Sequence, residues 1–363
     1  MRVLIVRIGA MGDVLHALPA VAALRERHPQ CFIGWAIEPR WSDLLQIEGD
    51  FEDLSQGVGR FAPKAMVDRW YRVPTERWRR KPFARETLAD VLALRGVLRR
   101  ERFDVCVDLQ GSIKSAVVGR MAEAKVLVGP DAPRERVARR LYGRRVDVTA
   151  RHVVEQACQI LSAAISDVGG EALHPARVKL PMGTQDEHFA DRVTRGERFC
   201  LISPTAGWGA KEWPAERYGQ VAAALGRGGL RTLVNASVSG SDAANTVVAA
   251  SEGCATAVPC TLGQLISLTR RAEVVIAGDT GPLHLAAALE RPVVGIYGPT
   301  NAARNGPWKT RSKVLRDPGS VTSHKRVGTV EEGMLLITVD EVVAAALELI
   351  SGESSGVRSS SST

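Results

Sequence analysis

Short apolar runs alternate with helix-like segments along this chain of 363 residues. Alternation of this kind predicts βαβ units and mainly parallel sheets. The strand-like runs are 3–8, 32–37, 105–109, 125–128, 199–203, 232–235, 274–277 and 293–297. The predicted helices are 13–27, 214–226, 241–252, 262–271 and 281–289. We therefore expect an α/β protein built from Rossmann-like units.

The chain is long enough for two domains. With 45% apolar residues, its 363 residues can form two cores of ordinary size. The best linker is 167–183, which contains two adjacent glycines and two prolines. We expect Rossmann-like domains at 1–170 and 185–350, a linker at 171–184, and a cleft between the domains. Residues 351–363 are rich in Ser and are expected to be a disordered tail.

The composition favours a cytoplasmic protein. The six cysteines lie in apolar contexts without paired C-x-x-C spacing, which argues against a disulfide framework and against a zinc site. Residues 1–7 are typical of a buried strand, and Arg7 and Asp13 interrupt any apolar region that a signal peptide would need. No segment reaches the roughly 18 consecutive apolar residues of a membrane span. We expect no bound metal.

The apolar run at 274–277 leads directly into polar residues and a predicted helix. Asp279, Thr280 and Gly281 follow the run, and Pro282 stands in the first helical turn. The N–H groups of a first turn have no intrahelical partner, and together with the helix dipole they attract anions. Pro282 fits there because its missing N–H would have had no partner. This stretch predicts a site for a phosphorylated ligand.

A second polar turn follows the run at 199–203. Thr205 and Lys211 lie between that run and a helix that begins near Pro214. A lysine ammonium can bind a phosphate as a compact point charge, and a threonine hydroxyl can donate to another oxygen. The alternative is an ordinary surface lysine. The matching turn at 279–281 favours the phosphate.

The turn after the first strand contains Gly9, Gly12 and Asp13. It lacks the G-x-G-x-x-G spacing of dinucleotide-binding proteins, and its acid would repel a pyrophosphate, so an NAD site is disfavoured. A carboxylate at the end of this strand, facing a cleft between domains, is better placed to abstract a proton. From the pattern alone, an equally good interpretation is that Asp13 caps the following helix.

Basic residues are concentrated in the N-terminal half of the chain. Residues 60–103 carry thirteen Lys or Arg and five acids, a balance of +8 that equals the formal charge of the whole chain. The densest part, 77–81, combines guanidinium groups with Trp78. It would suit an anionic lipid surface, a phosphorylated glycolipid or a nucleic acid. The alternative is a basic helix face exposed to solvent.

Four motifs together resemble one known family. They are R-I-G-A-M-G-D-V-L-H-A-L-P at 7–19, R-W-R-R at 77–80 with D-L-Q-G-S-I-K-S at 108–115, the segment 208–214, and 278–285 with Y-G-P-T at 297–300. In this combination and order the chain resembles the family 9 glycosyltransferases, the lipopolysaccharide ADP-heptosyltransferases, and among them the heptosyltransferase I type. The resemblance extends over nearly the whole chain.

The resemblance implies a GT-B architecture and an inverting transfer that needs neither metal nor cofactor. The donor would be ADP-L-glycero-D-manno-heptose, bound by the second domain. The acceptor would be the Kdo region of the lipopolysaccharide inner core, bound by the first domain. Asp13 would be the general base that deprotonates the acceptor hydroxyl. The alternative is heptosyltransferase II, or a related family 9 enzyme with another donor or acceptor.

The resemblance also implies a donor site. Charge that develops on the departing diphosphate would be offset by a cation and by oriented hydrogen-bond donors. Asp279 would hold heptose hydroxyls or order its loop, and His284 would pack or hydrogen-bond beneath it. The family often has a Glu for the ribose after the second strand of this domain, where the present chain offers only Asp242. The implied donor-binding residues are Thr205, Lys211, Asp242, Asp279, Thr280, Gly281 and His284.

The basic N-terminal half would then bind the acceptor. Kdo carboxylates and lipid A phosphates are anions that Lys and Arg can bind by point-charge or bidentate contacts. Near an anionic membrane each such cation adds on the order of 1 kcal/mol. We expect peripheral contact with the cytoplasmic face of the inner membrane, without nucleic acid or an obligatory protein partner. The implied acceptor-binding residues are Arg60, Lys64, Arg77, Arg79, Arg80, Lys81, Lys114 and Arg120.

A non-enzymatic binder of anionic glycolipid or nucleic acid is the remaining alternative. The two matching phosphate-site turns argue against it. Such a binder should tolerate Asp13→Ala with its binding intact, whereas a transferase that loses its base should slow by about 10²–10⁴ while its donor still binds.

Overall fold

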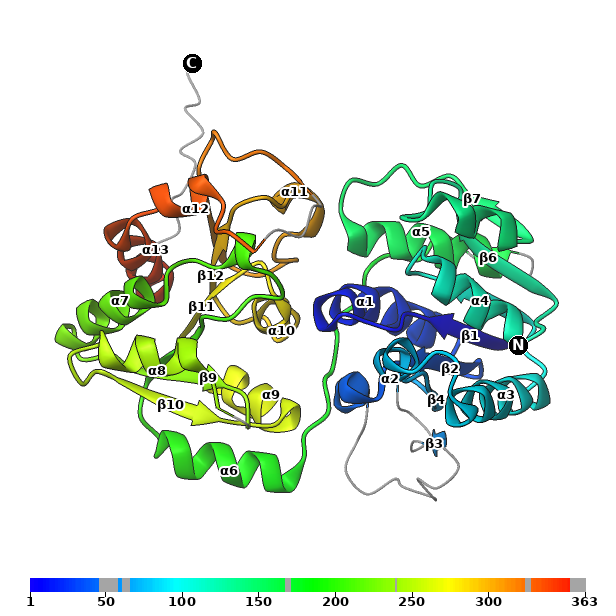
Figure 1. Ribbon diagram of the computed structural model, residues 1–363, viewed down its shortest axis with the longest axis horizontal. Coiled ribbons are helices and arrows are strands. Elements are labelled where there is room, and N and C mark those ends of the chain that lie inside the picture. The colour runs from blue at the N-terminus through cyan, green and yellow to red at the C-terminus, as the bar shows by residue number, and fades with distance from the viewer. Residues whose placement is uncertain (46–57, 61–65, 167–170, 239, 324–327, 353–363) are drawn as a thin grey trace, which may run out of the picture. The chain divides into compact units, whose positions relative to one another are not determined.

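The computed structural model describes residues 1–45, 58–60, 66–166, 171–238, 240–323 and 328–352. The chain forms two compact units, Met1–Asp186 and Glu187–Thr363. Each unit has its own β-sheet with helices packed against it (Figure 1). Among the described residues, no helix is long and apolar enough to cross a bilayer.

The sheet of the N-terminal unit has the strand order β3-β4-β2-β1-β5-β6-β7. Neighbouring strands are parallel, except that β3 runs antiparallel to β4. Residues 3–6 are fully buried, as expected for a strand that is covered on both faces of a parallel sheet. The strands are β1 (Arg2–Val6), β2 (Phe32–Ile37), β3 (Val58–Arg60), β4 (Arg69–Arg72), β5 (Val105–Asp108), β6 (Val126–Pro130) and β7 (Arg144–Val146).

Helices follow these strands and cover the sheet. α1 packs against α5, which also contacts β5 and β6, while α4 packs on β1 and β5 and contacts α3. The apolar face of α3 is narrow: only Thr87, Leu94 and Leu98 are buried. The helices are α1 (Met11–Arg27), η1 (Pro39–Leu44), α2 (Thr75–Arg80), α3 (Arg85–Arg100), α4 (Ile113–Met121), η3 (Arg136–Leu141) and α5 (Val153–Ile165).

The sheet of the C-terminal unit is wholly parallel in its described strands, in the order β10-β9-β8-β11-β12-β13. The central strands β8, β11 and β12 are buried along their entire length. The strands are β8 (Phe199–Ser203), β9 (Arg231–Ala236), β10 (Ala255–Pro259), β11 (Val274–Gly278), β12 (Val293–Tyr297) and β13 (Ser312–Arg316).

A hydrophobic core of the C-terminal unit lies where α7, α8 and α13 pack on this sheet, and it includes Trp213 and Tyr218. α9 and α10 contact each other and also pack on the central strands β8, β11 and β12. The helices are α6 (Thr184–Thr194), η5 (Gly209–Lys211), α7 (Ala215–Arg227), α8 (Asp242–Ala249), α9 (Leu262–Arg271), α10 (Gly281–Ala288), α11 (Ala302–Asn305), α12 (Glu332–Leu336) and α13 (Val339–Ser351).

The predicted fold class is confirmed: both units are Rossmann-like, with mainly parallel sheets. All eight strand-like runs form strands, and all five predicted helices form within two or three residues of the predicted limits. The linker at 171–184 stays a prediction; residues 171–183 lie outside regular helices and strands. Most of the predicted tail, residues 353–363, lies outside the described residues.

Candidate functional site

Several loops of the C-terminal unit leave the sheet at one edge. β8, β11 and β12 are adjacent and parallel, so their carboxyl ends meet there. Ala277 near the end of β11 pairs with Ser203 at the end of β8. The loops 204–211, 279–280 and 298–301 therefore start side by side, and this edge is where ligands bind in open parallel sheets.

Asp279 is the centre of a buried polar network at this edge. Its side chain is 6% exposed, and its Oδ2 accepts a hydrogen bond from the Lys211 ammonium at 2.5 Å. Its Oδ1 lies 3.0 Å from Nε2 of His284 in α10. Burial alone would raise the pKa of Asp279, but His284 and Lys211 together hold this pKa well below its ordinary value. Asp279 therefore stays charged and fixes both partners beside the start of α10.

Lys211 is held in place by contacts within its own loop. Lys211 ends the short helix η5, and its Nζ lies 5.4 Å from the centre of the Trp208 ring. At this distance the ring face attracts the ammonium. A Cβ at Gly209 would lie 2.1 Å from the carbonyl oxygen of Gly328, so only glycine fits there. The lysine is thus held by its own loop as well as by Asp279.

The first turn of α10 keeps its anion-binding character. Thr280 is the N-cap residue, but its side chain makes no capping hydrogen bond. Its hydroxyl donates instead to the carbonyl of Gly278 at 3.3 Å. The N–H groups of the first turn, which begins at Gly281, are therefore not satisfied by this side chain. With the Lys211 ammonium nearby, the turn can bind a phosphate.

Thr205 and Asp242 have exposed side chains. Thr205 follows β8, and Asp242 is the first residue of α8, after the neighbouring strand β9. Both residues thus lie at the same sheet edge as Asp279. In the part of the chain that the structure describes, neither side chain has a hydrogen-bond or ion-pair partner, so both are accessible to a ligand.

Asp279→Asn is expected to remove stability that depends on pH. Because the pKa of Asp279 is depressed in the folded state, its charge stabilises the fold above the ordinary value of about 4 and stops doing so as the pH falls through the lower folded value. Near neutral pH the substitution should cost on the order of 3 kcal/mol of unfolding free energy. Urea titrations of both proteins should show a smaller gap at about pH 3 than at about pH 6. Equal gaps would contradict this role.

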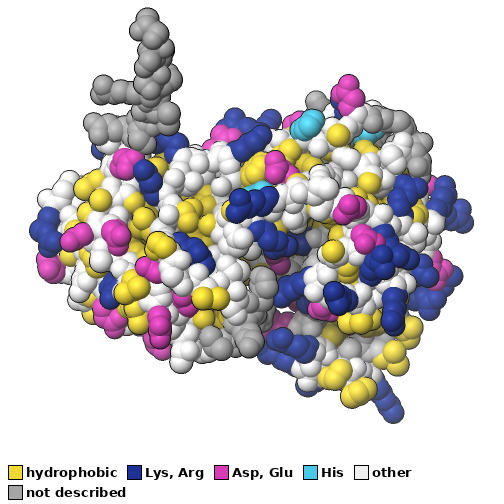
Figure 2. All heavy atoms as spheres, turned by 90° about the horizontal axis from the view of Figure 1, so that it is seen from above, with side chains coloured by type: hydrophobic (Ala, Val, Ile, Leu, Met, Phe, Trp, Pro, Cys, Tyr) yellow, Lys and Arg dark blue, Asp and Glu magenta, His cyan; other side chains and the backbone are white. Residues whose placement is uncertain are grey.

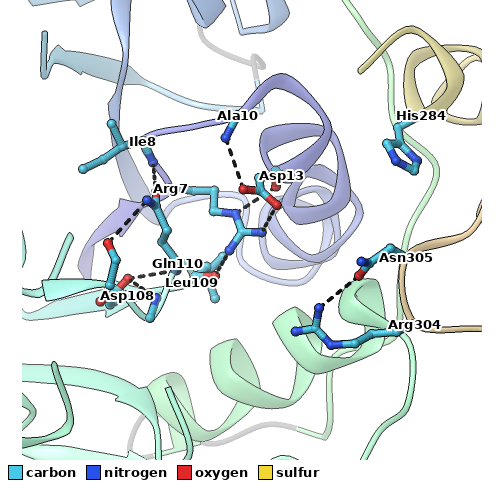
Figure 3. A network of polar contacts seen from close by, with 12 residues as sticks. Arg7, Ile8, Ala10, Asp13, Asp108, Leu109, Gln110, His284, Arg304 and Asn305 are labelled. Atoms are coloured by element: carbon cyan, nitrogen blue, oxygen red, sulfur yellow. Dashed lines mark hydrogen bonds and ion pairs between the residues drawn. The ribbon is translucent and has the colours of Figure 1, made fainter. Parts of the chain in front are cut away.

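Asp13 in the N-terminal unit is held by two neighbours in the turn after β1 (Figure 3). The Arg7 guanidinium donates to Oδ1 of Asp13 at 3.0 Å and to the Asp13 carbonyl at 2.9 Å. The Ala10 N–H donates to Oδ2 at 3.1 Å. The same guanidinium donates to the carbonyl of Leu109, after β5. Asp13 therefore caps α1 and also presents a carboxylate that is 37% exposed.

Asp108, the last residue of β5, fixes the loop that follows it. Its side chain is fully buried and accepts hydrogen bonds from the Tyr142 hydroxyl at 2.8 Å and the Ser115 hydroxyl at 2.9 Å. Burial raises the pKa of Asp108, although hydrogen bonds oppose this. Oε1 of Gln110 accepts from the Ile8 N–H at 2.8 Å (Figure 3). The D-L-Q-G motif thus joins β5 to the turn that carries the candidate base.

Two of the predicted acceptor residues are paired with acids. Arg77 forms an ion pair with Asp90 of α3. Arg80 pairs with Glu76 at 2.8 Å, one turn earlier in α2. Both side chains remain half-exposed or more, so an acceptor anion would have to compete with these carboxylates.

The other predicted acceptor residues differ in their surroundings. Arg79, Lys81 and Arg120 are exposed, and within the described ranges their side chains have no hydrogen-bond or ion-pair partner. Arg60 ends β3, of which the structure describes only the backbone. Lys64 lies outside the described residues.

Sequence reasoning missed a polar cluster around Lys114. Glu38 is 8% exposed and accepts from the Thr75 N–H at 3.0 Å and from its hydroxyl at 2.7 Å. The Lys114 ammonium lies 3.4 Å from the same hydroxyl, and partial burial lowers the pKa of Lys114. These residues follow three different strands, β2, β4 and β5. They are therefore far apart along the chain, and no local sequence pattern indicates that they lie together.

Sequence reasoning also missed the role of Arg7. The residue belongs to a recognised motif, but its contact with Leu109 depends on the pairing of β1 with β5. Over the ranges that the structure describes, no group of three or more His, Cys, Asp or Glu side chains could hold a metal ion.

Two Rossmann-like units, one of them with a lysine and a helix N-terminus at the carboxyl edge of its sheet, are typical of proteins that bind a nucleotide or another phosphorylated ligand. The model of glycosyltransferase family 9 (heptosyltransferase) matches residues 91–334, and the chain belongs to this family. The chain is therefore a glycosyltransferase, as its four sequence motifs implied.

Relatives match over most of their length. The chain is 26% identical to lipopolysaccharide heptosyltransferase 1 of Escherichia coli O18:K1:H7 over 338 residues, which cover 92% of this chain and 96% of the relative. It is also 26% identical to the Pseudomonas aeruginosa enzyme of the same name, over 85% of this chain and 81% of the relative. The solved E. coli heptosyltransferase WaaC with ADP is 25% identical, with a TM-score of 0.75, and the match covers 96% of this chain and all of that one.

Proposed function

We propose that the protein transfers heptose from ADP-L-glycero-D-manno-heptose to the Kdo region of the lipopolysaccharide inner core, with inversion and without a metal. The observation that carries the proposal is the Lys211 ammonium, which Asp279 holds beside the first turn of α10. A fixed cation and a helix N-terminus can stabilise the charge that develops on a leaving diphosphate. The relatives named lipopolysaccharide heptosyltransferase 1 and the structural relative with ADP support this donor and acceptor.

In the proposed reaction, Asp13 is the general base. Its carboxylate takes the proton of the acceptor hydroxyl while the hydroxyl oxygen bonds to the anomeric carbon of the heptose. The bond from that carbon to the diphosphate breaks, and ADP leaves with the electron pair. Arg7 keeps the carboxylate in one orientation through its contacts with Oδ1 and the Asp13 carbonyl. A base positioned in this way contributes about 10²–10⁴ to a rate.

The proposed donor-binding residues bind the diphosphate, the heptose and the ribose. Lys211, Thr205 and the Thr280 and Gly281 N–H groups bind the diphosphate, and Asp279 with His284 holds this loop or the heptose hydroxyls. Asp242 is the residue proposed for the ribose. These roles are supported by the common position of all the residues at or beside the carboxyl edge of one sheet.

The acceptor-binding residues are proposed because they are positively charged and the acceptor is an anion. Arg79, Lys81 and Arg120 offer exposed cations, and Lys114 offers one that is partly buried beside Thr75. Arg77 and Arg80 offer cations that are already paired with acids. Arg60 and Lys64 are proposed to act with them. We place the protein in the cytoplasm, in peripheral contact with the inner membrane, because this is where an acceptor carrying Kdo and lipid A would meet it.

Release of ADP from ADP-heptose tests the proposed function. We expect rapid release with Kdo-bearing lipid A and slow release with the same acceptor after one heptose has been added. The reverse preference would indicate the heptosyltransferase II reaction. Release with neither acceptor would refute the proposed substrates, and a screen of sugar nucleotides for binding would then identify the donor.

A further inference from the structure

Large apolar side chains are exposed where α2 leads into α3. Phe83 is 99% exposed, Leu88 61% and Leu92 56%. Ala84 is the N-cap of α3, so Phe83 and Leu88 occupy the two positions that often pack together as a hydrophobic staple. The exposure of the phenyl ring shows that this staple is not formed. We call Phe83, Leu88 and Leu92 the α3 apolar surface.

The two leucines lie on the side of α3 that faces α4. Residues seven apart share a helix face, and Arg95 and Arg99 follow the leucines at this spacing. Both arginines pair with Glu123, just after α4. α4 itself exposes Ile113 and Val117, one turn apart. The exposed apolar side chains of the two helices therefore lie on neighbouring faces.

Cations surround the α3 apolar surface. Residues 79–88 contain four Lys or Arg and one acid. Arg79, Lys81 and Arg85 are exposed. The ion pair between Arg77 and Asp90 ties α2 to α3 and so keeps these cations near the apolar side chains. Figure 2 shows Lys and Arg side chains gathered over the N-terminal unit, with hydrophobic side chains among them.

We propose that the α3 apolar surface inserts into the interfacial layer of an anionic lipid bilayer, while the cations at 79–85 contact the headgroups. Apolar side chains flanked by Lys and Arg are the combination that interfacial binding needs. A protein partner would favour an interface whose centre is depleted of charge, and cations adjoin this surface directly. The inference rests on the proposed function, because an acceptor with lipid chains requires the enzyme to work at a membrane.

Co-sedimentation with vesicles tests this inference. The variant replaces all three side chains, Phe83→Ser with Leu88→Gln and Leu92→Gln, and leaves every cation in place. With vesicles of phosphatidylethanolamine and phosphatidylglycerol, we expect its partition coefficient to fall by about tenfold or more relative to the parent. The matched control is Leu347→Gln, which replaces a 50%-exposed leucine of α13 and should bind as the parent does. Phosphatidylcholine vesicles should bind the parent weakly.

Equal binding of the triple variant and the parent would overturn the inference, because charge alone would then account for association. A parent that ignores phosphatidylglycerol vesicles, or that uses these side chains only to self-associate, would also overturn it. Circular dichroism of the triple variant shows whether it is folded. The single variant Phe83→Ser repeats the vesicle measurement with a smaller change, so that loss of folding can be excluded as the cause of weaker binding.

Activity separates this inference from the proposed function. With a water-soluble acceptor that lacks acyl chains, the triple variant should release ADP at the rate of the parent. An active parent that does not bind vesicles would contradict only the membrane surface. An inactive parent whose vesicle binding depends on the three apolar side chains would contradict only the proposed reaction.

Discussion

Asp13→Ala is expected to lower kcat by about 10²–10⁴ while ADP still binds. The acceptor hydroxyl loses the carboxylate that is proposed to take its proton, whereas the residues proposed to bind the diphosphate lie at the edge of the other sheet. Initial rates of ADP release at saturating donor and acceptor measure the first effect, and calorimetric titration with ADP measures the second.

The matched control for this substitution is Asp131→Ala. Asp131 is an aspartate of the same unit, 44% exposed, and it pairs with Arg139. Surface pairs contribute little, so its kcat should stay within about twofold of the parent. A variant at position 13 that keeps the rate of the parent would show that another group is the base.

Lys211→Met is expected to lower kcat/KM for the donor by about 10²–10³. The substitution removes the cation that lies 2.5 Å from Asp279 at the edge of the sheet. It thereby removes the counter-charge proposed for the leaving diphosphate. The affinity for ADP should fall as well, because product and transition state carry the same group. Steady-state kinetics with varied donor and calorimetry with ADP provide the two measurements.

Lys313→Met is the matched control for Lys211→Met. The Lys313 ammonium also lies 2.5 Å from a carboxylate, that of Glu348, but both side chains are about one-third exposed. Its kinetics should resemble those of the parent. If Lys211→Met folds and binds ADP as tightly as the parent, the account of the donor site is wrong.

The central strands could be predicted from the sequence because they are continuous apolar runs. β1, β8, β11 and β12 are buried on both faces, and their runs end sharply at polar turns. The strands that were missed were β3, β4, β7, β10 and β13. All five lie at or next to a sheet edge. Of these, β10 and β13 are only partly buried and carry a weak apolar pattern.

The sequence predicted which chain segments contribute to the candidate site, but it did not predict which residues of these segments contact one another. Asp279 and Lys211 were each chosen from a local turn, but they are 68 positions apart, and their ion pair depends on the pairing of β8 with β11. Likewise, 102 residues separate Arg7 from the carbonyl of Leu109 that it contacts. Local patterns identify strand ends well, whereas contacts between ends depend on strand order, which the patterns do not contain.

The α3 apolar surface could not be predicted from the sequence. The charge of 77–81 was visible in the sequence, but the exposure of the neighbouring apolar residues was not. Phe83 directly precedes the N-cap of α3, a position where an apolar side chain often packs against the helix. Only the structure shows that the ring is 99% exposed.

The mass of the acceptor after incubation tests the central claim most directly. Kdo-bearing lipid A, ADP-heptose and the parent protein should give an acceptor heavier by one heptose, in an amount equal to the ADP released. The same mixture with Asp13→Ala should give almost none. An acceptor of unchanged mass, with or without consumption of the donor, would contradict the assignment of heptosyl transfer to this protein.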